Sequence, residues 1–143
     1  MKVTPYVSYN GKCEEAVLFY RSVLGGEAQF MRYSDLPPEE GITIGDGWKS
    51  KIMHGSLALD GGAVIFFGDT WEGSSVEFGS SNTIHINVDS EPDVERIVAG
   101  LSEGGEVTMP AERTFWGSAY GGLVDKYGVH WGVEYELPTA EDS

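Results

Sequence analysis

The sequence contains an internal repeat. Residues 4–27 align without a gap with residues 83–106, so that Thr4 falls on Thr83. Each copy begins with alternating polar and apolar residues, continues through a helix-length segment and ends at a Gly-Gly pair. Such a repeat constrains the fold before any motif is considered, because each copy is one supersecondary unit that needs a neighbour to bury its apolar face.

Hydrophobic periodicity predicts the order strand, helix, strand, strand, strand in each copy. Gly25-Gly26 is a helix stop, and Asp60-Gly61-Gly62 is typical of a hairpin turn. The last two strands of the copies also superpose when Phe66 is placed on Gly132. We expect the elements of the first copy at residues 3–8, 12–24, 27–33, 52–59 and 63–68. We expect those of the second copy at residues 83–89, 91–102, 106–112, 119–125 and 129–136.

This order predicts an α+β fold. Two βαβββ modules are expected to form one curved mixed sheet of eight strands, with helices on the convex face and a cleft on the concave face. Ligands commonly bind in such clefts. We expect a single domain at residues 1–137, with modules at 2–68 and 82–136. A Gly- and Ser-rich linker is expected at about residues 69–81 and an acidic tail at 138–143.

Composition excludes several classes of function. The net charge of −14 argues against nucleic-acid binding and against anionic membranes. No apolar run approaches the roughly 20 residues of a membrane span, and the N-terminus lacks the apolar stretch of a signal peptide. The single cysteine, Cys13, cannot form an internal disulfide, which fits a reducing cytoplasm. We therefore expect a cytoplasmic protein that binds neither nucleic acid nor membrane.

Two local motifs narrow the fold to a family. The first is Phe19-Tyr20 followed by Val23-Leu24-Gly25-Gly26, and the second is Trp116-Gly117, Tyr120-Gly121, Asp125, Tyr127-Gly128 and Trp131. Together with the repeat, residues 2–136 resemble the vicinal oxygen chelate superfamily, which includes glyoxalase I, bleomycin-resistance proteins and extradiol dioxygenases. The second motif resembles its PhnB-like branch. Members of this branch are often labelled demethylubiquinone methyltransferase-like, but the sequence has no Gly-rich nucleotide-binding turn followed by an acidic residue.

The resemblance implies four positions for metal ligands. In metal-dependent members, His or Glu occupies these positions on the first and last strands of each copy. In this sequence they correspond to Thr4 (or Pro5, if the register slips), Phe66, Thr83 and Gly132. None is a His, Asp or Glu, although metals of this class need such donors converging on one point. We therefore expect no metal at the usual site.

Neighbouring donors leave a metal-dependent alternative open. His85, His130 and Glu134 each lie two residues from a ligand position of the second copy, and residues two apart share a strand face. Together with His54 they could form a shifted site of two histidines and one carboxylate for a divalent metal. Alternatively, these side chains are simply polar lining of the cleft.

The main function hypothesis is a metal-independent protein that binds a small, partly aromatic molecule. Its expected cleft residues are Tyr6, His54, Phe66, His85, Trp116 and Tyr120. Aromatic side chains can stack on a planar ligand, but Trp116 and Tyr120 could equally belong to a dimer interface or to the core.

Two enzyme alternatives remain open. One is a lyase, isomerase or dioxygenase with a divalent metal at the shifted site. The other is a metal-free acid–base enzyme with His54 or His85 as the base. The resemblance also implies a homodimer, in which the long Pro- and Gly-rich loop at residues 35–48 could form an arm.

Overall fold

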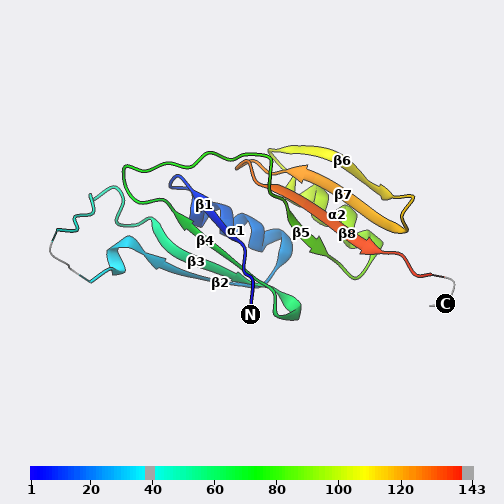
Figure 1. The fold of residues 1–143 in the computed structure, drawn as a ribbon, viewed down its shortest axis with the longest axis horizontal. Helices are drawn as coiled ribbons and strands as arrows, with labels where there is room; N and C mark the ends of the chain where they lie inside the picture. The colour runs from blue at the N-terminus through cyan, green and yellow to red at the C-terminus, as the bar shows by residue number, and fades with distance from the viewer. Residues whose placement is uncertain (38–40, 140–143) are drawn as a thin grey trace. The chain divides into compact units, whose positions relative to one another are not determined.

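The computed structural model describes residues 1–37 and 41–139 (Figure 1). The chain divides into two compact units, Met1–Glu77 and Phe78–Ser143. Each unit has the predicted order strand, helix, strand, strand, strand, so the α+β fold of βαβββ repeats is confirmed. The eight strands hydrogen-bond as two mixed sheets of four, one in each unit.

The first unit is a four-stranded sheet with one helix against it. Its elements are β1 (Tyr6–Tyr9), α1 (Cys13–Leu24), β2 (Glu27–Arg32), β3 (Ile52–Ala58) and β4 (Val64–Asp69). Short 3₁₀ turns lie at Tyr33–Asp35 and Asp60–Gly62. The strand order is β1-β4-β3-β2, with β1 parallel to β4 and the other pairs antiparallel.

The second unit repeats this arrangement. Its elements are β5 (Ile84–Asn87), α2 (Glu91–Leu101), β6 (Glu106–Arg113), β7 (Ser118–Val124) and β8 (His130–Glu136). The strand order β5-β8-β7-β6 has the same pattern of one parallel and two antiparallel pairs. Tyr6 pairs with Phe66 in the first unit, and His85 pairs with Gly132 in the second. The sequence alignment places Tyr6 on His85 and Phe66 on Gly132. Equivalent residues of the two copies are therefore paired in the same way between the first and last strands of each unit.

The start of the first strand is the main difference from the predicted elements. It was expected at residues 3–8, but β1 begins at Tyr6. Pro5 has no N–H with which to extend the ladder, and its carbonyl accepts a 2.9 Å hydrogen bond from the Phe66 N–H instead. Thr4, one of the expected ligand positions, therefore lies before the strand.

Aromatic packing forms the core of the first unit. The buried side of α1 carries Ala16, Val17 and Tyr20 and contacts β2, β3 and β4. The Tyr20 and Tyr9 hydroxyls lie 2.8 Å apart, and both rings pack against Phe67. Because the two hydroxyls hydrogen-bond each other, both tyrosines can be fully buried at little cost.

In the second unit, α2 packs on β7 and β8. Its buried residues are Val94, Ile97, Val98 and Leu101. The Ser90 hydroxyl accepts a hydrogen bond from the Asp93 N–H and caps the helix. Trp131 was expected in the core, and it is only 1% exposed.

Each unit also contains a buried carboxylate that holds loops in place. Asp69 accepts hydrogen bonds from the N–H groups of Gly11, Cys13 and Ile52. Asp125 accepts from the N–H groups of Tyr127 and Val129 and from the Trp131 indole. Backbone donors of irregular segments are thereby satisfied without water.

Two predicted segments fall partly outside the described residues. The expected arm at residues 35–48 includes residues 38–40, and the expected tail at 138–143 includes residues 140–143. Where the first segment is described, its end is fixed to its own unit, because the Trp48 indole donates to the Thr70 carbonyl. Over the described residues, neither helix has the length and apolar character needed to cross a bilayer.

Candidate functional site

The candidate site residues of the first unit lie together on the sheet face opposite α1. Strand alternation and register place Tyr6, His54 and Phe66 on this face. The His54 ring lies 4.7 Å from the Phe66 ring, edge to face, and 5.8 Å from the Tyr6 ring. Tyr6 is half exposed. These three side chains form the first aromatic cluster.

A glycine makes room for Tyr6 in this cluster. A Cβ at Gly68 would overlap the Tyr6 hydroxyl and the Met53 carbonyl. The Tyr6 hydroxyl donates a 3.4 Å hydrogen bond to that carbonyl. Burial, with smaller effects from Cys13 and Asp69, raises the pKa of Tyr6, so its phenol stays protonated and can donate.

In the second unit, Glu134 is the centre of a polar network on the face opposite α2. One carboxylate oxygen, Oε1, lies 3.4 Å from His85 Nε2. The other, Oε2, accepts hydrogen bonds from Trp116 Nε1 at 3.3 Å and from the Ser118 hydroxyl at 3.0 Å. The hydrogen bond from Trp116, followed by those from Ser118 and the His85 contact, lowers the pKa of Glu134. The carboxylate is therefore anionic at neutral pH.

Aromatic rings surround this network. Tyr120 stacks on His85 with a centroid distance of 6.2 Å and an interplanar angle of 22°. Trp116 lies 6.4 Å from Tyr120 and 5.1 Å from Phe115. Trp116 is 53% exposed and Phe115 is 97% exposed. His85, Trp116 and Tyr120 form the second aromatic cluster, which presents large apolar surface to solvent.

The Tyr120 hydroxyl explains the glycine at position 132. A Cβ on Gly132 would lie 2.7 Å from Tyr120 Oη, closer than real Cβ contacts allow. Tyr120 therefore occupies the space that a metal-binding side chain at position 132 would need.

The residues present do not fit the usual metal of the superfamily. Phe66 offers an aromatic ring and Gly132 offers no side chain, so two of the four implied positions have no donor atom. At the shifted site, His85 contacts Glu134, but within residues 1–37 and 41–139 no three His, Cys, Asp or Glu side chains gather around one point.

The structure thus divides the predicted cleft residues into two groups of three. Each group is assembled within its own unit, and each contains a tyrosine–histidine contact. His130 lies on the same face of β8 as Glu134 but is not part of the Glu134 network. The sequence prediction missed Ser118, which is 3% exposed and holds Glu134. Ser118 could have been found from the sequence, because it lies two residues before Tyr120 and therefore on the same face of the strand.

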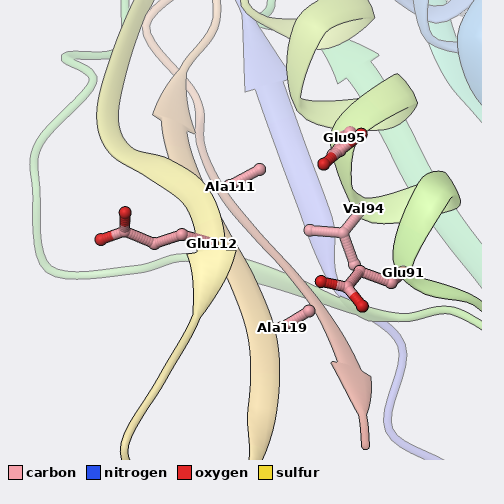
Figure 2. Close-up of a pocket in the computed structure, with 6 residues that line it drawn as sticks. All are labelled: Glu91, Val94, Glu95, Ala111, Glu112 and Ala119. Carbon is pink, nitrogen blue, oxygen red and sulfur yellow. The ribbon is translucent and has the colours of Figure 1, made fainter.

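A small pocket lies elsewhere, between α2 and its sheet. It is partly open, and its empty space of about 150 Å³, open solvent included, is still below the usual size of a ligand site. Figure 2 shows the residues that line it: Glu91, Val94 and Glu95 from α2, and Ala111, Glu112 and Ala119 from the sheet. The Glu112 carboxylate points away from the helix in this view, and Glu91 is paired with Arg113. This pocket contains none of the cluster residues.

The βαβββ repeats define a protein of the glyoxalase/bleomycin-resistance/dioxygenase fold, the vicinal oxygen chelate superfamily. A family model described as 3-demethylubiquinone-9 3-methyltransferase matches residues 1–134, and the chain belongs to this PhnB-like family.

Similar proteins cover nearly the whole chain. Protein PA1353 from Pseudomonas aeruginosa is 34% identical, with a TM-score of 0.82 over 96% of this chain and 99% of that one. A PhnB protein from Bacillus cereus, described as a putative 3-demethylubiquinone-9 3-methyltransferase, is 22% identical, with a TM-score of 0.73 over 94% and 99%. Protein YjdN from Escherichia coli (strain K12) is 24% identical over 97% of this chain and 99% of its own.

More distant structures share the fold alone. A glyoxalase/bleomycin resistance protein from Albidiferax ferrireducens is 16% identical, with a TM-score of 0.62 over 95% of this chain and 99% of that one. The fosfomycin resistance protein FosX from Listeria monocytogenes, in complex with Mn(II), is 12% identical, with a TM-score of 0.61 over 99% and 95%.

Proposed function

We propose that this protein binds a small, partly aromatic molecule without a resident metal. The proposed contacts are His85, Trp116 and Tyr120 of the second aromatic cluster. Tyr6, His54 and Phe66 of the first aromatic cluster offer a separate candidate surface within their own unit. The observation that carries the proposal is the solvent-exposed aromatic surface around the Glu134 network, with Trp116 53% exposed beside Tyr120. Exposed aromatic rings next to convergent polar atoms are typical of ligand sites.

A ligand screen with matched tryptophan variants tests this proposal. Aromatic compounds that raise the melting temperature are titrated against wild type, Trp116→Ala and Trp71→Ala. Trp71 is the control because it is equally exposed, at 51%, but packs on Tyr33. We expect Trp116→Ala to weaken binding about five- to tenfold, the value of one lost aromatic contact, and Trp71→Ala to have no effect. The proposal is contradicted if no compound in the screen binds, or if Trp116→Ala and Trp71→Ala weaken binding equally.

A metal-free acid–base enzyme is the second candidate function. The contact between Glu134 and His85 favours it, because a carboxylate beside an imidazole orients a general base. It also favours His85 over His54, whose described neighbours are the rings of Tyr6 and Phe66. If His85→Ala left a discovered activity intact while His54→Ala abolished it, this assignment would be wrong.

We do not propose the methyltransferase activity named in the family description. The sequence offers no Gly-rich turn for a nucleotide-containing cofactor. We also propose a homodimer in the cytoplasm, which rests on the resemblance to the superfamily and on the single buried cysteine. Light scattering on the purified protein tests the dimer, and a monomer at micromolar concentration would exclude it.

A further inference from the structure

The Glu134 network joins three separate segments of the second unit. Glu134 lies on β8, His85 lies on β5, and Trp116 lies in the loop before β7. Ser118, at the start of β7, supplies a further hydrogen bond. A single carboxylate therefore contacts two of the three side chains of the second aromatic cluster, His85 and Trp116.

The chemistry of the partners fixes the direction of the hydrogen bonds to Glu134. An indole N–H can only donate and an ionised carboxylate can only accept. Glu134 Oε1 lies 3.4 Å from His85 Nε2, so the anion favours the neutral tautomer with the ring proton on Nε2, because the other tautomer would set a lone pair against the carboxylate. The other ring nitrogen, Nδ1, is then an acceptor. The His85 side chain is 44% exposed, and no hydrogen bond to Nδ1 is found within the described residues.

We infer that Glu134 is a positioning residue that keeps His85 Nδ1 as a hydrogen-bond acceptor, so that the second aromatic cluster selects planar aromatic ligands carrying an O–H or N–H donor. The ligand selectivity rests on the proposed function. The tautomer of His85 is a property of the ligand-free protein and does not depend on it. Tyr120 stacks on the imidazole at 22° and limits its rotation, and Trp116 offers the ring of the ligand an exposed aromatic neighbour.

The variant Glu134→Gln reverses this arrangement without changing the size of the side chain. Trp116 can only donate, so the amide oxygen must face Trp116 and Ser118. The amide NH₂ group then faces His85, and Nε2 must become the acceptor. The ring proton moves to Nδ1, which changes from an acceptor to a donor.

The tautomer is measured first, in the ligand-free protein. At about pH 9, where imidazole is neutral, ¹⁵N NMR distinguishes a protonated ring nitrogen from an unprotonated one. His85→Gln identifies the His85 signals among the three histidines. Glu136→Gln is the matched control, because Glu136 lies two residues further along the same face of β8 and the variant removes the same charge. We expect the Nε2–H form in wild type and Glu136→Gln, and the Nδ1–H form in Glu134→Gln. An Nδ1–H form in wild type, or no change in Glu134→Gln, overturns the positioning role.

The ligand class is measured with two compounds that differ in one donor. 2-Naphthol has an O–H group and 2-methoxynaphthalene only an acceptor oxygen. By calorimetry, we expect wild type and Glu136→Gln to prefer 2-naphthol about fivefold, the value of one net hydrogen bond. In Glu134→Gln the preference falls to about one, because Nδ1–H donates to either oxygen. Equal affinities in wild type overturn the ligand class. If neither compound binds any variant, both the ligand class and the proposed function fail, whereas the NMR result still decides the role of Glu134.

Discussion

At the scale of single residues, the candidate site depends on side chains that occupy space left by glycines. The Tyr120 hydroxyl lies over Gly132, and the Tyr6 hydroxyl lies over Gly68. Both glycines have ordinary backbone angles, so the reason for a glycine is the close approach of a side chain rather than a special turn.

The variant Gly132→Ala therefore moves Tyr120. The added methyl group would lie 2.7 Å from Tyr120 Oη, which is the far end of a side chain that can swing aside. We expect a loss of less than about 1 kcal/mol in the free energy of unfolding but a clear loss of aromatic-ligand affinity. Denaturation and titration measure the two effects. Tyr120→Phe in the same background removes the hydroxyl and should restore part of the affinity; a fully active Gly132→Ala would contradict this role of Tyr120.

Asp125 is expected to matter for stability rather than for binding. Asp125 is 3% exposed, and its carboxylate accepts hydrogen bonds of 2.8 to 3.1 Å from Tyr127, Val129 and Trp131. Asp125→Ala leaves these donors unpaired and should lower the free energy of unfolding by about 3 kcal/mol. Urea denaturation measures the change, with the exposed Asp89→Ala as a control for the lost charge. A change below about 1 kcal/mol would show that water replaces the carboxylate.

The Glu134 network also predicts a pH dependence of stability. Hydrogen bonds from Trp116 and Ser118 lower the pKa of Glu134 in the folded protein. This contribution is present above the unfolded pKa of about 4.3 and is lost as the pH falls through the lower folded value. At pH 7, the urea midpoint of unfolding should therefore be higher for wild type than for Glu134→Gln. The difference between the two midpoints should shrink below about pH 4. A difference that is constant with pH would mean that the charge of Glu134 is not what stabilises the fold.

At the scale of the elements, the two helices begin in different ways. α2 has the Ser90 cap, whereas α1 has no side-chain cap of its own and its first N–H bonds to Asp69 from β4. Ser90→Ala should cost about 1 kcal/mol in the free energy of unfolding. Thermal denaturation measures this cost, and Ser102→Ala at the other end of α2 is the control. Equal effects of both variants would argue against a specific cap.

The sequence predicted the elements better than the site. Periodicity and the Gly-Gly stops located the helices and strands. The alignment of the two copies placed Tyr6 on His85 and Phe66 on Gly132, and the strand registers show that these residues form equivalent pairs in the two units. The start of β1 was missed because strand alternation includes Pro5, although Pro5 lacks the N–H that the ladder needs. The role of Glu134 was not predictable, because its partners come from β5, from β7 and from the loop before β7. Only the folded register brings these distant parts of the sequence together.

At the scale of the whole molecule, both copies of the repeat contain a contact between a tyrosine and a histidine, but the two residue types have exchanged positions. The first unit places Tyr6 on its first strand against His54, at 5.8 Å. The second places His85 on its first strand against Tyr120, at 6.2 Å. Each equivalent position thus has the other residue type. The polar network around Glu134 is described only in the second unit, so the two copies, though alike in fold, offer a ligand different chemistry.

The charge of the whole chain predicts a salt dependence of stability. The chain has 23 acidic and 9 basic residues and a net charge of −14, so its acidic groups repel one another in the compact state. The screening length falls from about 10 Å at 0.1 M salt to about 3 Å at 1 M. Raising NaCl from about 0.05 to 1 M at pH 7 should therefore increase the melting temperature by several degrees.

The same measurement at lower pH separates charge screening from other effects of salt. The isoelectric point is near 4.4, so at about pH 5 much of the negative charge is neutralised and the repulsion is weaker. Screening then has less to relieve, and the rise in melting temperature with NaCl should be clearly smaller than at pH 7. The double variant Glu103→Gln/Glu106→Gln removes two exposed negative charges. At pH 7, its melting temperature should therefore rise less with NaCl than that of wild type. A salt effect of equal size at both pH values would instead assign it to the burial of apolar surface, which salt strengthens whatever the net charge.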